Sequence, residues 1–523
     1  MTTRPAPQTL TRRSLLALGT GGLVGCAAAP RPRPASPPIP AAAPLPGAVP
    51  LRAYDLAALR RDVGDRFVLP GQPAYALARR TRQPAFDAAA PRGVLQVLDA
   101  ADAADGLRAA RGSGVPVHVR SGGHSYGGWS TGPGLVLDLG GLSATRLEPE
   151  VLVVGAGTRL IDVYAAVGAD SALPSGSCPT VGIAGITLGG GVGVLSRQLG
   201  LTCDRLVSAE VVLPDGTMRT CSADSEPDLF WALRGGGAAP AGVLELRLSI
   251  APATTFTVWG ATFPWARAAM VLQAWDAWAP DAADELWSSL GLHAVPGGSA
   301  AQLTVTVVSS RGQGLDAELA PLLAVADPLT QGRQELAPLA AMLTEAGCGD
   351  LGVAACHPAP GEPGGRRGGT RHRESFAATS SLLAAPLGAA GAAACVACVQ
   401  DRQDGGLGVG GLQLDALGGA VARVARTETA FPHRAARVLV QHAADRHARA
   451  APAVGAASAA WLARSRRALA PFATGGAYVN YADPGLAGWG RAYWGANLAR
   501  LREVARRYDP EGLLATGQCA RNA

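Results

Sequence analysis

The chain has 523 residues, 48% of them hydrophobic, and a formal net charge of +6. This length exceeds what one hydrophobic core supports, so at least two domains are expected. The charge is spread along the chain, which argues against a nucleic-acid-binding surface. No apolar run after the N-terminus is long enough for a membrane-spanning helix, so the body is expected to be a soluble globular fold.

The first 25 residues have the pattern of an export signal. Thr11-Arg-Arg-Ser-Leu-Leu16 matches the twin-arginine motif, and a short apolar stretch follows at 15–24. Leu23-Val-Gly-Cys26 resembles a bacterial lipobox, in which the cysteine is acylated and becomes the mature N-terminus. We therefore expect a twin-arginine lipoprotein signal peptide at 1–25, a lipid anchor at Cys26 and a location in the cell envelope. Cleavage within 27–29, which would release a soluble exported protein, is the alternative.

The next segments along the chain divide into a tether and a folded domain. Residues 26–50 are rich in Pro and Ala, which is typical of a semi-rigid tether. Residues 80–250 alternate between strand and helix patterns, which predicts an α+β domain with mixed sheets. Strands are expected at 94–98, 115–120, 134–139, 151–155, 209–216 and 243–250, and helices at 101–113, 161–167 and 228–237.

The remainder of the chain is rich in Ala and Gly and gives weaker signals. Strand patterns at 304–308 and 407–414, flanked by helical stretches, favour a second sheet domain over 255–470, and 358–369 has the composition of an exposed loop. Residues 477–518 predict a strand, a loop, a helix over 491–508 and a tail.

Two short glycine-rich segments carry the strongest indication of chemistry. Arg120-Ser-Gly-Gly-His-Ser-Tyr126 and Ser177-Cys-Pro-Thr-Val-Gly182 each place a nucleophilic side chain beside backbone that can approach an anion closely. Taken singly, Cys178 could be a small buried hydrophobe and His124 a structural histidine. Together they are an imidazole and a thiol, the two groups most often bonded covalently to a flavin ring.

These motifs resemble those of the berberine-bridge-enzyme-like FAD-linked oxidases of the vanillyl-alcohol-oxidase fold, over about 80–518. Three further segments match the same family: 182–193 (Gly-Ile-Ala-Gly-Ile-Thr-Leu-Gly-Gly-Gly-Val-Gly), 228–237 (Asp-Leu-Phe-Trp-Ala-Leu-Arg-Gly-Gly-Gly) and 477–481 (Ala-Tyr-Val-Asn-Tyr). The resemblance implies a PCMH-type FAD-binding domain of two subdomains at 80–250. It also implies a substrate domain with an antiparallel sheet flanked by helices at 255–470, and a C-terminal segment, 471–523, that returns to the FAD domain.

The resemblance also assigns roles to residues. It implies FAD held by two covalent bonds, from His124 to the flavin 8α-methyl and from Cys178 to flavin C6. Val181 is placed as a gate near flavin C4a, where a small side chain is compatible with access of O2. The other residues that it assigns to cofactor binding are Arg120, Ser121, Gly122, Gly123, Ser125, Gly182, Gly185, Gly189, Gly190, Gly193, Val243, Tyr478 and Asn480.

The resemblance makes Tyr481 the catalytic base. A free phenol has a pKa near 10, so Tyr481 would need help from a neighbour to accept a proton near neutrality. Asn480, Tyr478 and Gln441 are candidates for that neighbour. His433 and Arg434 also match the family, in either a structural or a substrate-binding role.

Two positions differ from the family pattern. The loop at 238–243 reads Ala-Ala-Pro-Ala-Gly-Val where the family commonly has Asn and Phe, and Ile186 stands where plant relatives often carry His.

The glycines at 189–193 do not have the spacing or the acidic partner of a Rossmann fingerprint. Cys348 with Cys356 and Cys395 with Cys398 are close enough to pair, and no matching ligand pair follows at zinc-finger spacing, so no metal site is expected.

We therefore expect an exported FAD-dependent oxidase that takes hydride from a hydroxyl-bearing small molecule or carbohydrate and is reoxidised by O2 to give hydrogen peroxide. Twin-arginine export is consistent with a cofactor attached before the protein crosses the membrane. Oxidative cyclisation or desaturation of a secondary metabolite is one alternative. A binding lipoprotein of the envelope that has kept the fold without the chemistry is another.

Overall fold

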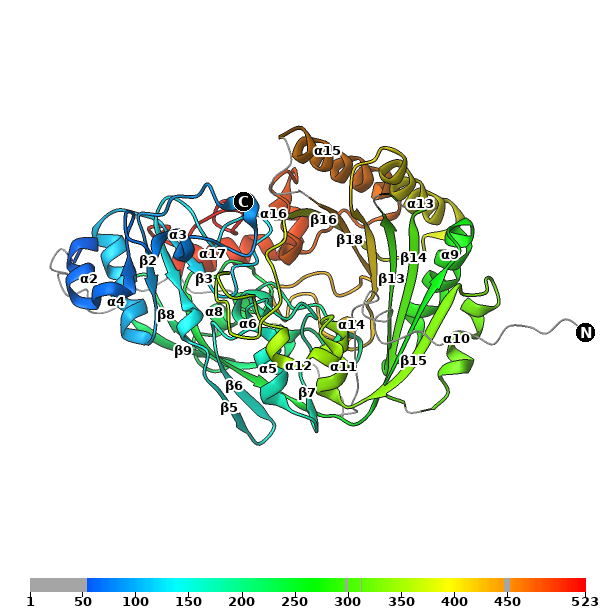
Figure 1. Cartoon of the computed structure of the whole chain (residues 1–523). Coiled ribbons are helices and arrows are strands. Elements are labelled where there is room, and N and C mark those ends of the chain that lie inside the picture. The colour runs from blue at the N-terminus through cyan, green and yellow to red at the C-terminus, as the bar shows by residue number, and fades with distance from the viewer. Residues whose placement is uncertain (1–53, 296, 298–299, 312, 446–451) are drawn as a thin grey trace, which may run out of the picture.

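The computed structural model describes residues 54–523 apart from 296, 298–299, 312 and 446–451. The predicted signal peptide and tether, with Cys26, lie outside the described residues. The described chain forms two lobes (Figure 1). We call 54–252 together with 477–523 the first lobe and 256–476 the second lobe. No helix among the described residues is long and apolar enough to cross a membrane.

The described strands of the first lobe form a four-stranded sheet in the order β1-β2-β4-β3, a five-stranded antiparallel sheet in the order β5-β6-β10-β8-β9, and the small pair β7 and β11. β3 and β2 both run parallel to β4. The strands are β1 (Phe67–Val68), β2 (Gly93–Gln96), β3 (Val117–Arg120), β4 (Leu135–Asp138), β5 (Thr145–Glu148), β6 (Val151–Gly155), β7 (Ser171–Ala172), β8 (Leu206–Val212), β9 (Met218–Ser222), β10 (Gly242–Ser249) and β11 (Ala251–Pro252).

The C-terminal segment closes the core of the first lobe. In α17 (Leu498–Tyr508), Leu501, Val504, Ala505 and Tyr508 are buried, at the spacing of one face of an α-helix. That face joins the same apolar cluster as α8 (Pro227–Ala232). The other helices of the lobe are α2 (Leu56–Val63), α3 (Tyr75–Ala78), α4 (Ala100–Gly112), α5 (Leu160–Val167), α6 (Ile183–Leu188), α7 (Ser196–Leu199) and α16 (Trp489–Trp494).

The described strands of the second lobe form one antiparallel seven-stranded sheet in the order β15-β12-β14-β13-β17-β18-β16. These strands are β12 (Phe256–Phe263), β13 (Leu286–Ala294), β14 (Gln302–Ser309), β15 (Thr330–Leu336), β16 (Phe376–Leu383), β17 (Gly410–Ala416) and β18 (Val438–Asp445). The helices of the lobe are α9 (Ala268–Trp278), α10 (Leu315–Leu323), α11 (Pro338–Glu345), α12 (Gly352–Ala355), α13 (Gly388–Asp404), α14 (Gly419–Arg423) and α15 (Pro452–Leu469).

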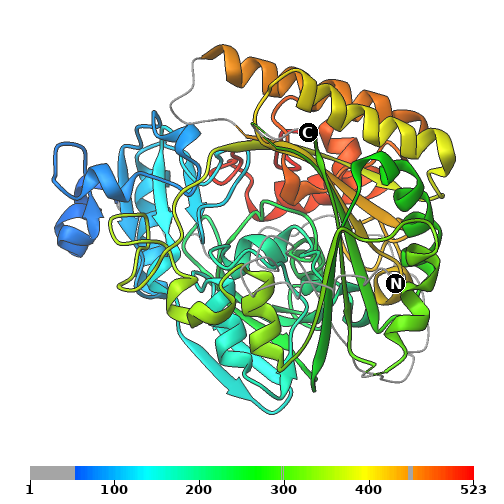
Figure 2. The same cartoon turned by 45° about the vertical axis from the view of Figure 1, so that its right-hand side comes forward.

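The two faces of this sheet differ in character because side chains alternate along each strand. In β17, Leu412 and Leu414 belong to the apolar cluster that includes α9, α13 and α15, which lie on the outer side of the sheet (Figure 2). Gln413 and Asp415 alternate with them and therefore face the first lobe. The sheet thus offers an apolar face to its own helices and a polar face to the space between the lobes.

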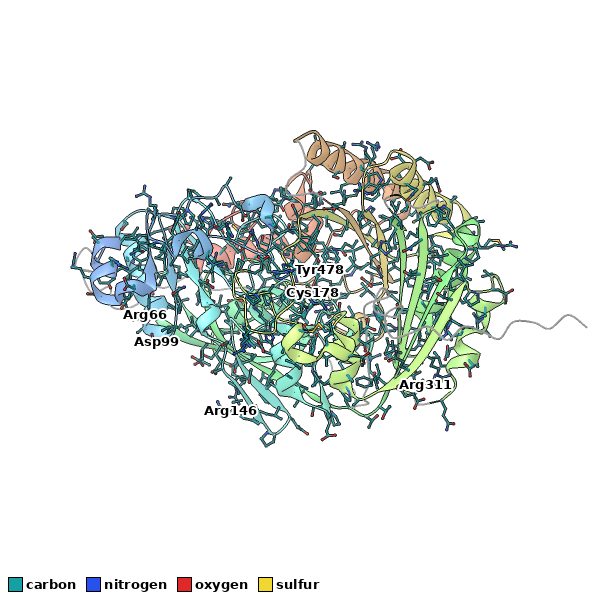
Figure 3. All side chains as sticks on the ribbon, in the orientation of Figure 1. Arg66, Asp99, Arg146, Cys178, Arg311 and Tyr478 are labelled. Atoms are coloured by element: carbon teal, nitrogen blue, oxygen red, sulfur yellow. A yellow bond between two sulfur atoms is a disulfide. The ribbon has the colours of Figure 1, made fainter. Side chains whose placement is uncertain are left out.

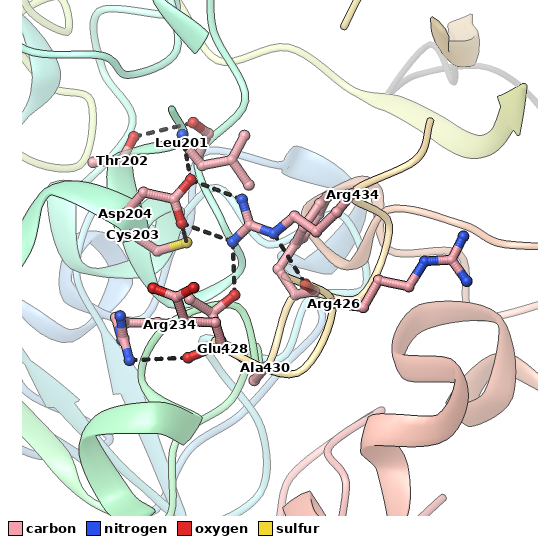
Figure 4. Close-up of polar contacts among 12 residues, drawn as sticks. Leu201, Thr202, Cys203, Asp204, Arg234, Arg426, Glu428, Ala430 and Arg434 are labelled. Atoms are coloured by element: carbon pink, nitrogen blue, oxygen red, sulfur yellow. Dashed lines mark hydrogen bonds and ion pairs between the residues drawn. The ribbon is translucent and has the colours of Figure 1, made fainter. Parts of the chain in front are cut away.

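A buried ion pair joins the two lobes (Figure 4). Arg434, which precedes β18, donates from Nη1 to Asp204 Oδ2 (2.8 Å) and from Nη2 to Asp204 Oδ1 (2.7 Å). The Arg434 side chain is 2% exposed and that of Asp204 9%. Arg434 Nη2 also donates to Thr429 Oγ1, and Asp204 accepts from the Leu201 backbone N–H, so both charged groups are hydrogen-bonded at several atoms.

A second buried arginine connects the two lobes through backbone carbonyl groups and not through a carboxylate. Arg197 of α7 is 1% exposed. Its guanidinium donates to backbone carbonyls of the second lobe, including Leu286 O (2.8 Å) and Pro280 O (2.7 Å). Because these carbonyls belong to separate segments, Arg197 fixes several loops of the second lobe against the first.

The predicted α+β class and the predicted antiparallel sheet flanked by helices are confirmed. Two local predictions near the C-terminus are wrong. Residues expected to form a strand after 477 instead form a 3₁₀ turn, Val479–Tyr481. The helix expected over 491–508 is broken at Gly495, whose φ of +49° ends α16 before α17 begins.

Removal of the Arg434 charge is expected to destabilise the protein, because it leaves the Asp204 carboxylate buried without its cationic partner. We expect Arg434→Met to lower the free energy of unfolding by about 3–5 kcal/mol in urea denaturation. The control is Arg464→Met, which breaks a pair whose side chains are 48% and 56% exposed. That change should cost less than about 1 kcal/mol. Equal effects of the two substitutions would contradict the role given to the buried pair.

Candidate active site

Two glycine-rich turns of the first lobe meet through their backbones. One follows β3 and carries His124, and the other precedes α6 and carries Cys178. A Cβ on Gly122 would lie 2.3 Å from the Gly182 nitrogen, and a Cβ on Gly182 would lie 2.0 Å from Ser121 Oγ. Side chains at these two positions would force the turns apart, so both glycines are required for this contact.

A single hydroxyl lies between the two predicted nucleophiles. Thr180 Oγ1 is 2.8 Å from His124 Nε2 and 3.9 Å from Cys178 Sγ. Thr180 is 2% exposed, whereas the Cys178 side chain is open to a cavity deep in the molecule. Figure 3 labels Cys178 in the centre of the molecule, where the two lobes meet. The imidazole and the thiol therefore face one space from adjoining turns.

Two arginines give this corner a positive potential. Burial, with the charges of Arg82 and Arg159, holds the pKa of His124 well below its usual value, so its imidazole is neutral. Burial raises the pKa of the Cys178 thiol, while Thr180 and the Arg82 charge act in the opposite direction. Arg159 donates to Thr180 O (2.7 Å), and Arg82 donates to His372 O (2.5 Å).

The space between the lobes is a cavity of about 450 Å³. This volume lies in the range of small-molecule sites. Gly185 forms part of its wall, and a Cβ added there would meet no other atom within 4 Å. Of the residues predicted from the sequence, those that line the cavity are Ser121, Gly122, Gly123, His124, Ser125, Cys178, Val181, Gly182, Gly185, Gly193, Val243, Tyr478, Asn480 and Tyr481.

Three residues predicted to bind the cofactor lie behind this lining. Arg120 is turned away, because its guanidinium pairs with Asp138 Oδ2 (2.9 Å) and donates to Ala78 O (2.6 Å). Gly189 lies against the Asn480 side chain, and Gly190 lies against the ring of Phe431. Gly189 and Gly190 allow the glycine-rich segment to pack closely against its neighbours.

Tyr478 organises that segment from the C-terminal side. Its hydroxyl oxygen accepts hydrogen bonds from Gly191 N (2.9 Å), Val192 N (3.0 Å) and Asn480 Nδ2 (2.9 Å). Burial raises the pKa of Tyr478 to about 12, so it stays a neutral phenol. Asn480 Nδ2 also donates to Ile186 O (3.0 Å). The 477–481 motif therefore supports the cavity wall.

The second lobe supplies the opposite wall. Gln413 and Asp415 of β17 and Gln441 of β18 reach the cavity from the polar face of the sheet. Gln441 Nε2 donates to Tyr126 OH (3.3 Å), and the rings of Tyr126 and Tyr481 are parallel within 3° at 5.8 Å between centroids. Two aromatic rings and three polar side chains thus bound this end of the cavity.

Asp415 and Tyr481 differ in their capacity to accept a proton. Burial raises the pKa of Asp415 to about 7. Burial and the nearby Asp415 charge raise the pKa of Tyr481 well above its usual value. No described residue hydrogen-bonds the Tyr481 hydroxyl, since Gln441 binds Tyr126 and Asn480 binds Tyr478. These shifts favour a protonated Tyr481 near neutrality, and they place the pKa of Asp415 where a carboxyl group can hold a proton or release it. The role of Tyr481 as catalytic base stays a prediction.

Sequence reasoning missed Thr180 and Asp415 as site residues. Thr180 lies inside the motif 177–182, but a threonine has no distinctive chemistry that would mark it as a site residue. Asp415 follows Leu412-Gln-Leu, and this apolar and polar alternation in a strand was the available signal. Trp287 of β13 also lines the cavity and had no signal.

His433 and the paired cysteine candidates of the sequence lie outside the cavity lining. His433 Nε2 lies 2.9 Å from Tyr493 O, outside the cavity lining, and burial lowers its pKa to about 4. Cys348 and Cys356 form a disulfide. Cys395 and Cys398 do not pair and are buried as free thiols in α13. No cluster of metal-ligating side chains occurs among the described residues.

Comparison with known proteins agrees with this geometry. The FAD binding domain family matches residues 91–222, and the berberine and berberine like family matches 477–518. The chain is 30% identical over 427 residues to the uncharacterized FAD-linked oxidoreductase YgaK of Bacillus subtilis, covering 79% of this chain and 87% of that protein. It is 27% identical to the xylooligosaccharide oxidase of Thermothelomyces thermophilus, covering 76% and 81% of the two chains. The solved structure of Physcomitrella patens BBE-like 1 superposes with a TM-score of 0.78 at 25% identity, covering 87% and 97%.

The residues present fit an FAD group. An added Cβ on Gly185 would meet no atom within 4 Å, so this part of the cavity wall leaves room for a flat ring system close to the backbone. His124 and Cys178 face this space from one corner. The loop at 238–241 lines the cavity through Ala238, Ala239 and Ala241.

Proposed function

We propose, from the premise that this chain belongs to the berberine-bridge-enzyme-like FAD-linked oxidoreductases, that it is an oxidase of carbohydrate hydroxyl groups. We further propose that one FAD is bonded to both His124 and Cys178. The observation that carries the proposal is the arrangement of the two nucleophiles around Thr180, in a corner of a cavity whose far wall is polar.

The proposed chemistry divides between the cofactor and the chain. Bound FAD supplies the acceptor for a hydride taken from the substrate. The substrate's hydroxyl proton must go to a group of the chain, and Asp415, with a pKa of about 7, is suited to accept it. Tyr481, which stays protonated, holds the substrate oxygen by donating a hydrogen bond and orients it for proton transfer to Asp415.

A carbohydrate substrate is supported by the composition of the far wall. Gln413, Asp415 and Gln441 offer the amide and carboxylate groups that bind hydroxyls, and Trp287 and Tyr126 offer flat apolar faces. The relative named as a xylooligosaccharide oxidase supports the same class of substrate. Val181 lines the cavity and is small enough to leave a path for O2, which supports reoxidation to give hydrogen peroxide.

An export route to the cell envelope is part of the proposal. The twin-arginine pattern and the lipobox-like segment ending at Cys26 support it. The disulfide between Cys348 and Cys356 fits an oxidising compartment. Labelled palmitate should be incorporated into the wild-type protein in a bacterial host and not into Cys26→Ala. Equal labelling of the two, or none in either, would remove the anchor from the account.

Double attachment predicts a specific behaviour of single variants. Cys178→Ala should keep flavin fluorescence on an acid-soaked denaturing gel, because the bond through His124 remains, and so should His124→Ala. The double variant should release all of its flavin into the acid supernatant. Complete release of flavin from Cys178→Ala alone would refute attachment at two points.

The proton acceptor predicts a pH dependence. With a group of pKa about 7 as base, kcat/KM for an oxidised oligosaccharide should rise with pH through that value and then level, because only the carboxylate accepts a proton. Asp415→Asn should lower kcat by about 10²–10⁴-fold and abolish the inflection, with bound flavin unchanged. Peroxide release across a panel of oligosaccharides, alcohols and phenolics identifies the substrate for this measurement. The matched control is Asp401→Asn, on the surface; an unaltered inflection in Asp415→Asn would exclude Asp415 as the base.

A further inference from the structure

We propose that the Thr180 hydroxyl positions both flavin-bonding side chains, presenting His124 with a free lone pair on Nδ1 and ordering Cys178 beside it. The proposal rests on the double attachment proposed above. It assigns to Thr180 a role in forming both bonds, because its hydroxyl contacts both bonding side chains. Thr180 is therefore a positioning residue, because it acts through His124 and Cys178.

The first step concerns the histidine. A neutral imidazole has one N–H donor and one nitrogen with a lone pair. Nε2 is engaged by Thr180 Oγ1 at 2.8 Å, and the other hydrogen-bonding neighbour of the ring is the backbone of the same residue. When Thr180 accepts the Nε2–H, the lone pair resides on Nδ1, and His124 lines the cavity. When Thr180 donates instead, Nδ1 carries the proton and cannot form a bond to carbon.

The second step concerns the direction of the hydrogen bonds. If Thr180 accepts from His124, its own hydroxyl hydrogen is free to point to Cys178 Sγ, 3.9 Å away. The positive charge of Arg82 favours electron density on that sulfur, and the charges of Arg82 and Arg159 disfavour a second proton on the imidazole. In the order N–H to O–H to S the imidazole stays neutral with its lone pair on Nδ1, and the sulfur of Cys178 accepts the hydroxyl hydrogen of Thr180.

The third step concerns rigidity. Arg159 Nη1 donates to Thr180 O (2.7 Å), and Arg159 Nη2 donates to Pro363 O (3.4 Å) in the second lobe. The turn is also closed by Val181 N donating to Cys178 O (3.3 Å). The turn that carries Thr180 is thus restrained by Arg159 and by its own backbone hydrogen bond, and the Thr180 hydroxyl lies between the two nucleophiles.

The attachment at His124 balances with O2 as the oxidant. A bond forms between Nδ1 and the 8α carbon, and one C–H bond of that methyl group breaks. The electron pair of the broken bond passes to O2. The proton from carbon and the proton from Nε2 go with it, so that hydrogen peroxide is the other product. The Thr180 hydroxyl oxygen is 2.8 Å from Nε2, the atom that must lose its proton.

The test uses full-length protein with Cys178→Ala as the parent, so that only the His124 bond retains flavin in acid. Thr180→Val keeps the shape of the side chain without its hydroxyl, and Thr180→Ser keeps the hydroxyl. After pulsed expression, flavin is measured as the acid-stable fraction of the total bound over time. We expect the Val variant to form the bond about tenfold more slowly than the parent, and the Ser variant to remain within about twofold. The total bound flavin should be the same in all three proteins.

Each result decides between the two proposals. Acid-stable flavin that forms equally fast in the Val variant and the parent overturns the role of Thr180 and leaves double attachment standing. No acid-stable flavin in the parent overturns the proposed attachment itself. If the Val variant binds no flavin, Thr180→Ala takes its place. Equal rates in the Ala and Ser variants then overturn the role of Thr180.

Discussion

The close contact between the Gly122 and Gly182 backbones sets the geometry on which the rest of the site depends. Each turn comes from a different part of the chain, one from the end of β3 and one from the segment before α6. Only residues without a Cβ can approach to this distance, since an added atom would lie 2.3 Å or less from the opposite turn. This contact is what brings an imidazole and a thiol to one hydroxyl.

The two walls of the cavity are kept in register by buried arginines. Arg434 of the second lobe pairs with the Asp204 carboxylate of the first, and Arg197 of the first lobe donates to backbone carbonyls of the second, including Leu286 O at the start of β13. A buried ion pair adds little net stability over an apolar pair of the same shape, but a lost partner is costly. Arg434 and Arg197 therefore act mainly to fix how the lobes meet. That relation decides where Asp415 lies relative to His124 and Cys178.

The sequence allowed prediction of the parts of the site that depend on local motifs. His124, Cys178 and Gly182 lie in short segments whose glycines are required for close backbone contact, and Tyr478 and Tyr481 of the C-terminal motif line the cavity. The helices and strands of the second lobe were harder to predict from the sequence. In β16 the run Ala-Ala-Thr-Ser-Ser consists of small residues, and α13 is rich in Ala and Gly around its buried positions, so neither shows a strong contrast between faces. Arg434 and Asp204 are 230 residues apart, and no local pattern connects them. Asp415 becomes recognisable as a site residue only when the sheet turns its polar face to the first lobe.

The central claim is that one flavin is bonded to both turns, and peptide mass spectrometry tests it most directly. Complete digestion with trypsin places His124 in the peptide 121–146 and Cys178 in the peptide 160–197. The account predicts one species whose mass is that of both peptides joined through a single flavin. Recovery of the two peptides separately and unmodified, from protein made in a host with ample flavin, would contradict it.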